Sequence, residues 1–181
     1  KPVSQEDKAL FDSVAKRIAE NSIVIHKNEE QLLPLNKDKI KKVISVDITN
    51  AEGPIDNPLD KVLIDNGVEI VKYGEYTENG VVSTPLLPNA DLLILNFSFG
   101  HIWGSNHIEP CGKQLQHIFR YILLSKLPVV AVCHGNPYIP KLFPYMKTVV
   151  NTFSQKNLDG KALYDVLFGI EDAKGTSPVK I

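Results

Sequence analysis

Three short, mostly apolar runs constrain the fold of this chain more than any other feature. They occupy residues 43–48, 92–95 and 129–132, and all are rich in valine, leucine or isoleucine. A strand that is buried on both faces has such a run, whereas a strand with one solvated face alternates apolar and polar residues. The sequence therefore favours parallel strands that are covered by helices on both faces.

Amphipathic helices are expected between these runs. Ser4 is a candidate N-cap, and the apolar residues Leu10, Phe11, Val14 and Ile18 repeat at helical spacing after it. Alternation of strands with helices predicts a three-layer α/β/α sandwich around a mainly parallel sheet, flavodoxin/Rossmann-like, with right-handed crossovers. The remaining expected strands span 68–73 and 147–153, and the helices span 4–21, 57–66, 113–125 and 158–168.

Composition narrows the classes of function. A length of 181 residues favours one domain, and 43% apolar residues suffice for a sizeable core. The formal charge of −1 argues against a nucleic-acid or membrane surface, and no apolar run reaches the ~18 residues of a membrane span.

Two cysteines form no zinc pattern, and we expect no cofactor. Because the chain begins at Lys1, it is interpreted as a mature product or a fragment, which leaves its compartment open.

The end of the run at 129–132 carries the first candidate chemistry. Cys133 and His134 follow it directly, and Asn136 with Pro137 is a typical N-cap and first residue of a helix. A helix N-terminus can lower a thiol pKa from ~8.5 to about 3.5–7.5, which would make a nucleophile. A small buried thiol before a structural turn is the alternative.

This pair resembles the nucleophile turn of the DJ-1/PfpI group in the glutamine-amidotransferase-like superfamily. In that group a Cys-His pair follows a buried strand, and a glutamate from a loop after an early strand approaches the thiol. Glu52 lies at the matching place here. The resemblance implies a thiol hydrolase or an amidotransferase-like domain that uses Cys133, His134 and Glu52.

Both ends of the chain resemble another family. Residues 20–35 read ENSIVIHKNEEQLLPL, and residues 167–181 read LFGIEDAKGTSPVKI. These segments are similar to the "SIVLLKNE…LLPL" opening and the "LFG…PxGxLPVxI" finish of the second domain of family 3 glycoside hydrolases. Residues 135–138 match the "GNPY" turn of that domain. The resemblance spans residues 8–181 in order and therefore outweighs the match at Cys133.

The second resemblance implies two domains with different roles in the parent enzyme. Residues 1–22 would be a linker helix from an upstream (β/α)8 barrel, and residues 23–181 would form one α/β sandwich domain. The nucleophile of this retaining family is a barrel aspartate, so no catalytic residue is expected in this chain, and the chain alone should be inactive. A carbohydrate substrate at the interface with the barrel is the implied partner, and the family favours a secreted or periplasmic location.

The segment at 98–112 separates two branches of the family. The β-glucosidase branch carries an acid/base glutamate there, but this chain has none at the matching place, and Glu109 comes late in the segment. The branch that removes N-acetylhexosamine takes its acid/base from the barrel, so the sequence favours that branch. Candidate sugar contacts in the segment are His101, Trp103, Asn106 and His107.

Two weaker interpretations remain open. The loop at 49–57, with Asp47, Glu52 and Asp56, follows the carboxyl end of a strand, where ligands bind in open α/β sheets. The sequence favours a solvated acidic turn over a ligand site at this loop. The domain as a whole could also be purely structural, whatever its parent enzyme catalyses.

Overall fold

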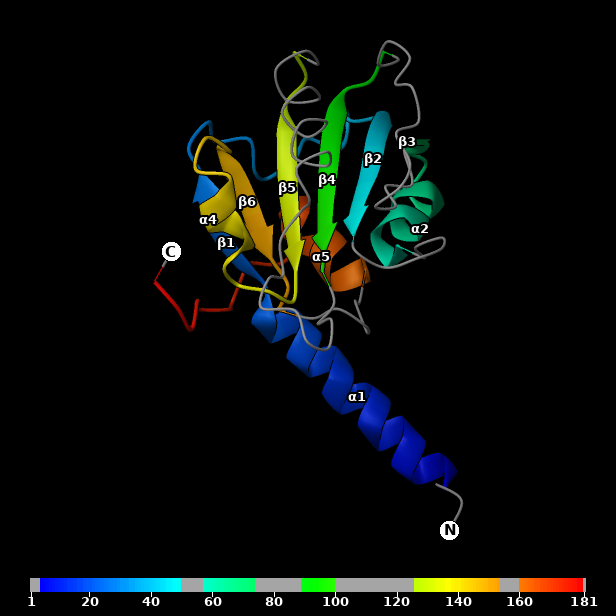
Figure 1. The fold of residues 1–181 in the computed structure, drawn as a ribbon. Helices are drawn as coiled ribbons and strands as arrows, with labels where there is room; N and C mark the ends of the chain where they lie inside the picture. Colours follow the sequence, from blue (N-terminus) through cyan, green and yellow to red (C-terminus); the bar gives the residue numbers. More distant parts are fainter. Residues whose placement is uncertain (1–3, 50–56, 74–88, 100–125, 154–159, 181) are drawn as a thin grey trace.

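Six strands form one sheet that runs through the centre of the protein (Figure 1). The computed structural model describes residues 4–49, 57–73, 89–99, 126–153 and 160–180. The strands are β1 Val24–Asn28, β2 Lys42–Thr49, β3 Glu69–Tyr73, β4 Leu92–Ser98, β5 Val129–His134 and β6 Thr148–Asn151. The helices are α1 Gln5–Ser22, α2 Pro58–Asp65, α4 Ile139–Leu142 and α5 Gly160–Leu167.

The strand order is β1-β6-β5-β4-β2-β3. The edge strand β1 runs antiparallel to β6, and the other neighbouring strands are parallel. The mainly parallel α/β fold predicted from the sequence is therefore confirmed. Because neighbouring parallel strands end at the same edge, the carboxyl ends of β2 to β6 meet on one side of the sheet.

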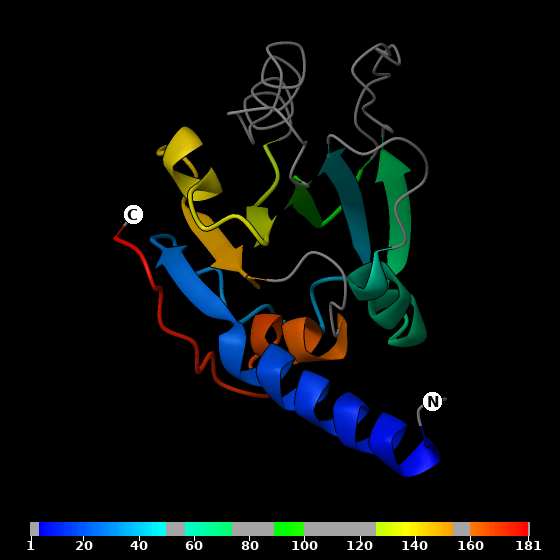
Figure 2. The same cartoon turned by 60° about the horizontal axis from the view of Figure 1, so that its bottom comes forward.

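Alternate residues of β2 to β6 enter separate apolar clusters on the two faces. On one face Val43, Leu92 and Val132 pack against Leu63 of α2 and Leu167 of α5. On the other face Leu93 and Phe97 pack with Ile139 of α4 and with Phe143, whose ring centroid lies 4.8 Å from that of Phe97. Figure 2 shows α2 and α5 on one side of the sheet and α4 on the other.

Helix α1 projects away from the sheet (Figure 1). Ser4 caps it as predicted, because its hydroxyl accepts a hydrogen bond from the Asp7 amide at 3.1 Å. None of its residues is buried. Within the described ranges, no helix has the length and apolar character that a membrane crossing requires.

The predicted helix start at Pro137 is wrong. Strand β5 continues through Cys133 and His134, and helix α4 begins only at Ile139. Asn136 does accept a backbone hydrogen bond, from Tyr138 N at 2.9 Å, but this bond closes a tight turn and caps no helix. The predicted helix at 113–125 lies outside the described residues.

Candidate functional site

The face of the sheet that α2 and α5 cover changes from apolar to polar toward the carboxyl ends of the strands. Going along β2 on this face, Val43 is followed by Ser45 and Asp47; along β4, Ile94 is followed by Asn96; along β5, Val132 is followed by His134. We call the resulting set the polar layer. It consists of Ser45, Asp47, Asn57, Asp60, Lys72, Asn96, His134 and Thr152.

One half of the polar layer is ionic. The Lys72 ammonium lies 2.5 Å from an Asp47 carboxylate oxygen and also pairs with Asp60. Burial raises the pKa of Asp60, and Lys72 opposes this rise. For Lys72, burial works to lower the pKa, but hydrogen bonds to the two carboxylates outweigh it and the pKa is raised. Two carboxylates thus share one ammonium.

Asn57 connects this ionic group to helix α2. Its Nδ2 donates to Asp47 Oδ1 at 3.1 Å, and its Oδ1 accepts from the Leu59 amide at 3.1 Å. The first bond holds the strand residue, and the second caps the helix. The start of α2 is therefore fixed relative to the end of β2.

The other half of the polar layer is neutral. Asn96 Nδ2 donates to Ser45 Oγ at 3.2 Å, and His134 Nδ1 lies 3.2 Å from Thr152 Oγ1. Asn96 and His134 are each 2% exposed. Burial lowers the pKa of His134 to about 4, although Asp47 opposes this. His134 is therefore uncharged at neutral pH and suits hydrogen bonding rather than charge stabilisation.

Cys133 does not share a site with His134. Successive strand residues point to opposite faces, and Cys133 packs in the apolar cluster with Phe97 and Phe143. Its thiol is free, the residue is 1% exposed, and burial raises its pKa. This environment suits a packed core thiol and does not supply a thiolate at neutral pH.

Several of the predicted site residues lie outside the part of the chain that the structure describes. They are Glu52, Asp56, His101, Trp103, Asn106, His107 and Glu109. The segment that holds the last five follows β4, whose end belongs to the rim beside the polar layer. In the described ranges, no group of three or more His, Cys, Asp or Glu side chains is arranged to hold a metal ion.

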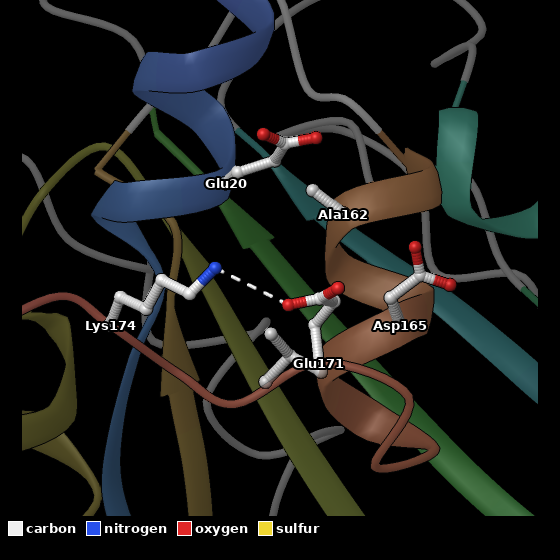
Figure 3. A pocket seen from close by; sticks show the side chains of 6 residues that line it. Glu20, Ala162, Asp165, Glu171 and Lys174 are labelled. Atoms are coloured by element: carbon white, nitrogen blue, oxygen red, sulfur yellow. Dashed lines mark hydrogen bonds and ion pairs between the residues drawn. The ribbon is translucent and has the colours of Figure 1, made fainter.

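A second feature is a polar hollow of about 130 Å³ between α1, α5 and the segment that follows α5. Figure 3 shows Glu20 of α1, Asp165 of α5, and Glu171 with Lys174 from the following segment around it. Lys174 pairs with Glu171 at 3.3 Å, and Lys161 pairs with Asp165 at 2.5 Å. The acidic groups are thus largely matched by lysines. Three separate segments line the hollow, so the sequence offered no local signal for it.

Sequence reasoning also missed Asp60, Lys72 and Asn96. A signal existed for Asn96, because a lone amide in the run Leu-Leu-Ile-Leu-Asn-Phe needs a partner when the strand is buried. Ser45 and Asp47 interrupt their own run at the same spacing of two. Asp60 and Lys72 pair because β3 lies beside β2. The spacing of residues in the sequence does not reveal that the two strands are neighbours.

Comparisons with known proteins agree with this architecture. No protein-family model matches the chain. A Cellulomonas fimi protein described as a β-N-acetylglucosaminidase/β-glucosidase is 23% identical over 92% of the chain. A solved β-glucoside phosphorylase, BglX bound to 2FGlc, matches 98% of the chain with a TM-score of 0.74 and 22% identity. The family 3 β-N-acetylglucosaminidase of Paenibacillus sp. str. FPU-7 matches 96% with a TM-score of 0.64 and 17% identity.

The chain spans about a third of the length of these relatives, 32% in each case. It therefore has the fold of one domain of larger enzymes, among them family 3 glycoside hydrolases. The resemblance drawn from the two chain ends is confirmed at the level of the fold.

Proposed function

We propose that this chain is the second domain of a family 3 glycoside hydrolase that removes terminal β-linked N-acetylhexosamine, or β-glucose, from carbohydrates. The observation that carries the proposal is the match of 98% of the chain, at a TM-score of 0.74, to 32% of a β-glucoside-processing enzyme. The motif order at both chain ends supports it independently. In this proposal a (β/α)8 barrel of the same polypeptide supplies the carboxylate nucleophile.

Helix α1 supports docking of this domain on further polypeptide. Its apolar residues Leu10, Phe11, Val14 and Ile18 are 60%, 62%, 42% and 63% exposed. An amphipathic helix normally buries such a stripe, and a contiguous exposed stripe marks an interaction surface. In the proposed enzyme, residues 1–22 link the two domains and the stripe packs against the barrel.

The N-acetylhexosamine branch is the preferred specificity. The segment at 98–112 has no glutamate at the place used by β-glucosidases, so the acid/base would come from the barrel. Two of the similar proteins are described as β-N-acetylglucosaminidases, one of them also as a β-glucosidase. In this proposal Trp103 stacks on the sugar, and His101, Asn106 and His107 hydrogen bond to it.

The decisive experiment combines gene sequence and assay. We expect the sequence that precedes Lys1 in the gene to encode a barrel, and the whole polypeptide to cleave 4-nitrophenyl N-acetyl-β-glucosaminide faster than the β-glucoside. The 181-residue chain alone should release no 4-nitrophenol. Turnover by this chain, or a start codon directly before Lys1, would overturn the proposal.

Two further arms refine the assay. Repeating it with inorganic phosphate distinguishes release of free sugar from release of a sugar phosphate, since one similar structure is a phosphorylase. Replacing Trp103 with alanine in the whole enzyme should raise KM, whereas Tyr138→Ala, at a 52% exposed aromatic residue, should not. Equal kinetics for the two variants would remove Trp103 from the sugar site.

A further inference from the structure

The two Asp60 carboxylate oxygens have no hydrogen-bond partner within the described residues, and Asp60 is instead paired ionically with Lys72. Two buried atoms of neutral side chains in the polar layer also have no hydrogen-bond partner there. They are Asn96 Oδ1 and His134 Nε2, and both residues are 2% exposed. An unpaired buried polar atom costs about 1–3 kcal/mol, so most such atoms are paired with protein or with ordered water. Two of them on neighbouring strands point to a shared ligand.

The strand order makes these atoms face each other. His134 on β5 directs Nδ1 to Thr152, which follows β6, so Nε2 on the other side of the ring is directed toward β4. Asn96 on β4 directs Nδ2 to Ser45 on β2, so Oδ1 is directed toward β5. The unpartnered atoms therefore lie on the two sides of the gap between β4 and β5.

The register sets the size of this gap. Asn96 pairs with Val132, and Ser98 pairs with His134, so Asn96 and His134 are diagonal neighbours on the same face. Strands about 4.8 Å apart and an offset of two residues, about 6.6 Å, put their Cα atoms roughly 8 Å apart. Asn96 Oδ1 and His134 Nε2 make no hydrogen bond to each other. One small molecule fits such a separation.

The chemistry of the two atoms selects that molecule. The amide oxygen only accepts, and a neutral imidazole nitrogen donates or accepts according to the tautomer. Water can donate to Asn96 Oδ1 and either accept from or donate to His134 Nε2, so it satisfies both tautomers. The amide oxygen would repel an anion, and a cation would suit only the tautomer whose Nε2 carries no proton, whereas water suits both tautomers.

We infer that one ordered water molecule binds between Asn96 Oδ1 and His134 Nε2. The water completes a hydrogen-bonded chain that runs from Ser45 through Asn96 to His134 and Thr152. This chain joins β2, β4, β5 and the end of β6. It ties together the strand ends from which the rim segments depart, and it does not depend on the proposed activity.

A crystal structure of the protein tests the inference directly. We expect a water oxygen about 2.7–3.2 Å from both atoms. A direct Asn96–His134 bond, or another side chain in the gap, would overturn it. In solution, water–amide NOEs should show a long-lived water near Val132, and its absence would also overturn the inference.

A double-mutant cycle supplies an independent thermodynamic test. Asn96→Leu and His134→Phe should each lower Tm, because each leaves one half of the bridge unpaired. The Tm of the double variant should fall by less than the sum of the two single decreases. The control pair is Asn96→Leu with Thr148→Val, at a buried residue outside the polar layer. In that pair the decreases in Tm should be additive. Additive losses in both pairs would contradict a shared water.

Discussion

Lys72 and Asp60 form an ion pair whose two members differ strongly in exposure. The Asp60 side chain is 7% exposed, whereas the Lys72 side chain is 47% exposed. The carboxylate has therefore lost most of its hydration, and Lys72 replaces it from the solvent side. Such asymmetry makes the acid depend on the lysine more than the lysine depends on the acid.

Replacing Lys72 with methionine should destabilise the protein by about 1–3 kcal/mol at pH 7. Removing one member of a buried pair costs about 3–5 kcal/mol, and the exposure of Lys72 reduces this figure. Burial already raises the pKa of Asp60, and loss of Lys72 should raise it further. Since the folded state then binds a proton more readily than the unfolded state, the loss should shrink as the pH falls.

Urea titrations at several pH values would measure both effects. Lys61→Met, at an exposed lysine that follows Asp60 in α2, provides the control and should change stability by less than about 0.5 kcal/mol. Similar losses for the two variants, or a loss that grows on acidification, would contradict a dependence of Asp60 on Lys72.

His134 should make the fold sensitive to mild acid. Burial lowers its pKa to about 4, from 6.5 in an unfolded chain. Above pH 6.5 the imidazole is neutral in both the folded and the unfolded state, so it does not make the stability depend on pH. Between pH 6.5 and 4 the unfolded state binds the proton first, so stability falls by up to about 3 kcal/mol.

The comparison with His134→Gln isolates this effect. The variant is expected to be less stable at pH 7 but to lose less stability than the wild type as the pH falls to 4. His26→Gln is the control, because burial also lowers the pKa of His26 but that residue is less buried. Parallel pH profiles for wild type and His134→Gln would rule out His134 as the source.

The sequence predicted the elements of this fold better than their arrangement. Local signals placed Ser4 and Asn57 at helix starts, and the structure confirms both. These signals succeed because capping depends on neighbours a few residues away. The order of the strands depends on contacts between distant segments, and no local pattern encodes it.

The candidate site shows the same limit. Cys133 and His134 are adjacent in sequence and suggested a catalytic pair, but the strand continues through both and turns them to opposite faces. Conversely, Asp47 and Lys72 are 25 positions apart and lie side by side because β2 and β3 are neighbours. Extending the predicted strand by two residues would have separated the apparent pair.

Cys133 should be inert to alkylation in the folded protein. In a Cys111→Ser background, iodoacetamide should label Cys133 only after denaturation, because the thiol is buried and its pKa is raised. Cys133→Ala should cost less stability than Cys133→Ser, since serine would bury a hydroxyl in an apolar cluster. Rapid labelling of the native state at neutral pH would restore the thiol-enzyme hypothesis.

Gly160 should not tolerate alanine, although it begins a helix. A Cβ atom there would lie 2.3 Å from both the carbonyl carbon and oxygen of Pro58, the first residue of α2. Alanine normally stabilises a helix relative to glycine by roughly 0.5–1 kcal/mol. Here the starts of α2 and α5 would have to separate, and both helices pack on the same apolar cluster. We expect overpacking to dominate and to cost about 1–3 kcal/mol.

Gly67→Ala separates this effect from backbone strain. Gly67 has a φ of +82°, but a Cβ atom there would meet nothing within 4 Å. Its substitution should therefore cost only about 1–2 kcal/mol for the left-handed backbone. Hydrogen exchange should distinguish the two variants further, because Gly160→Ala should increase exchange throughout α2 and α5, whereas Gly67→Ala should affect only the end of α2. If Gly160→Ala raised Tm, the close contact between the two helix starts would be wrong.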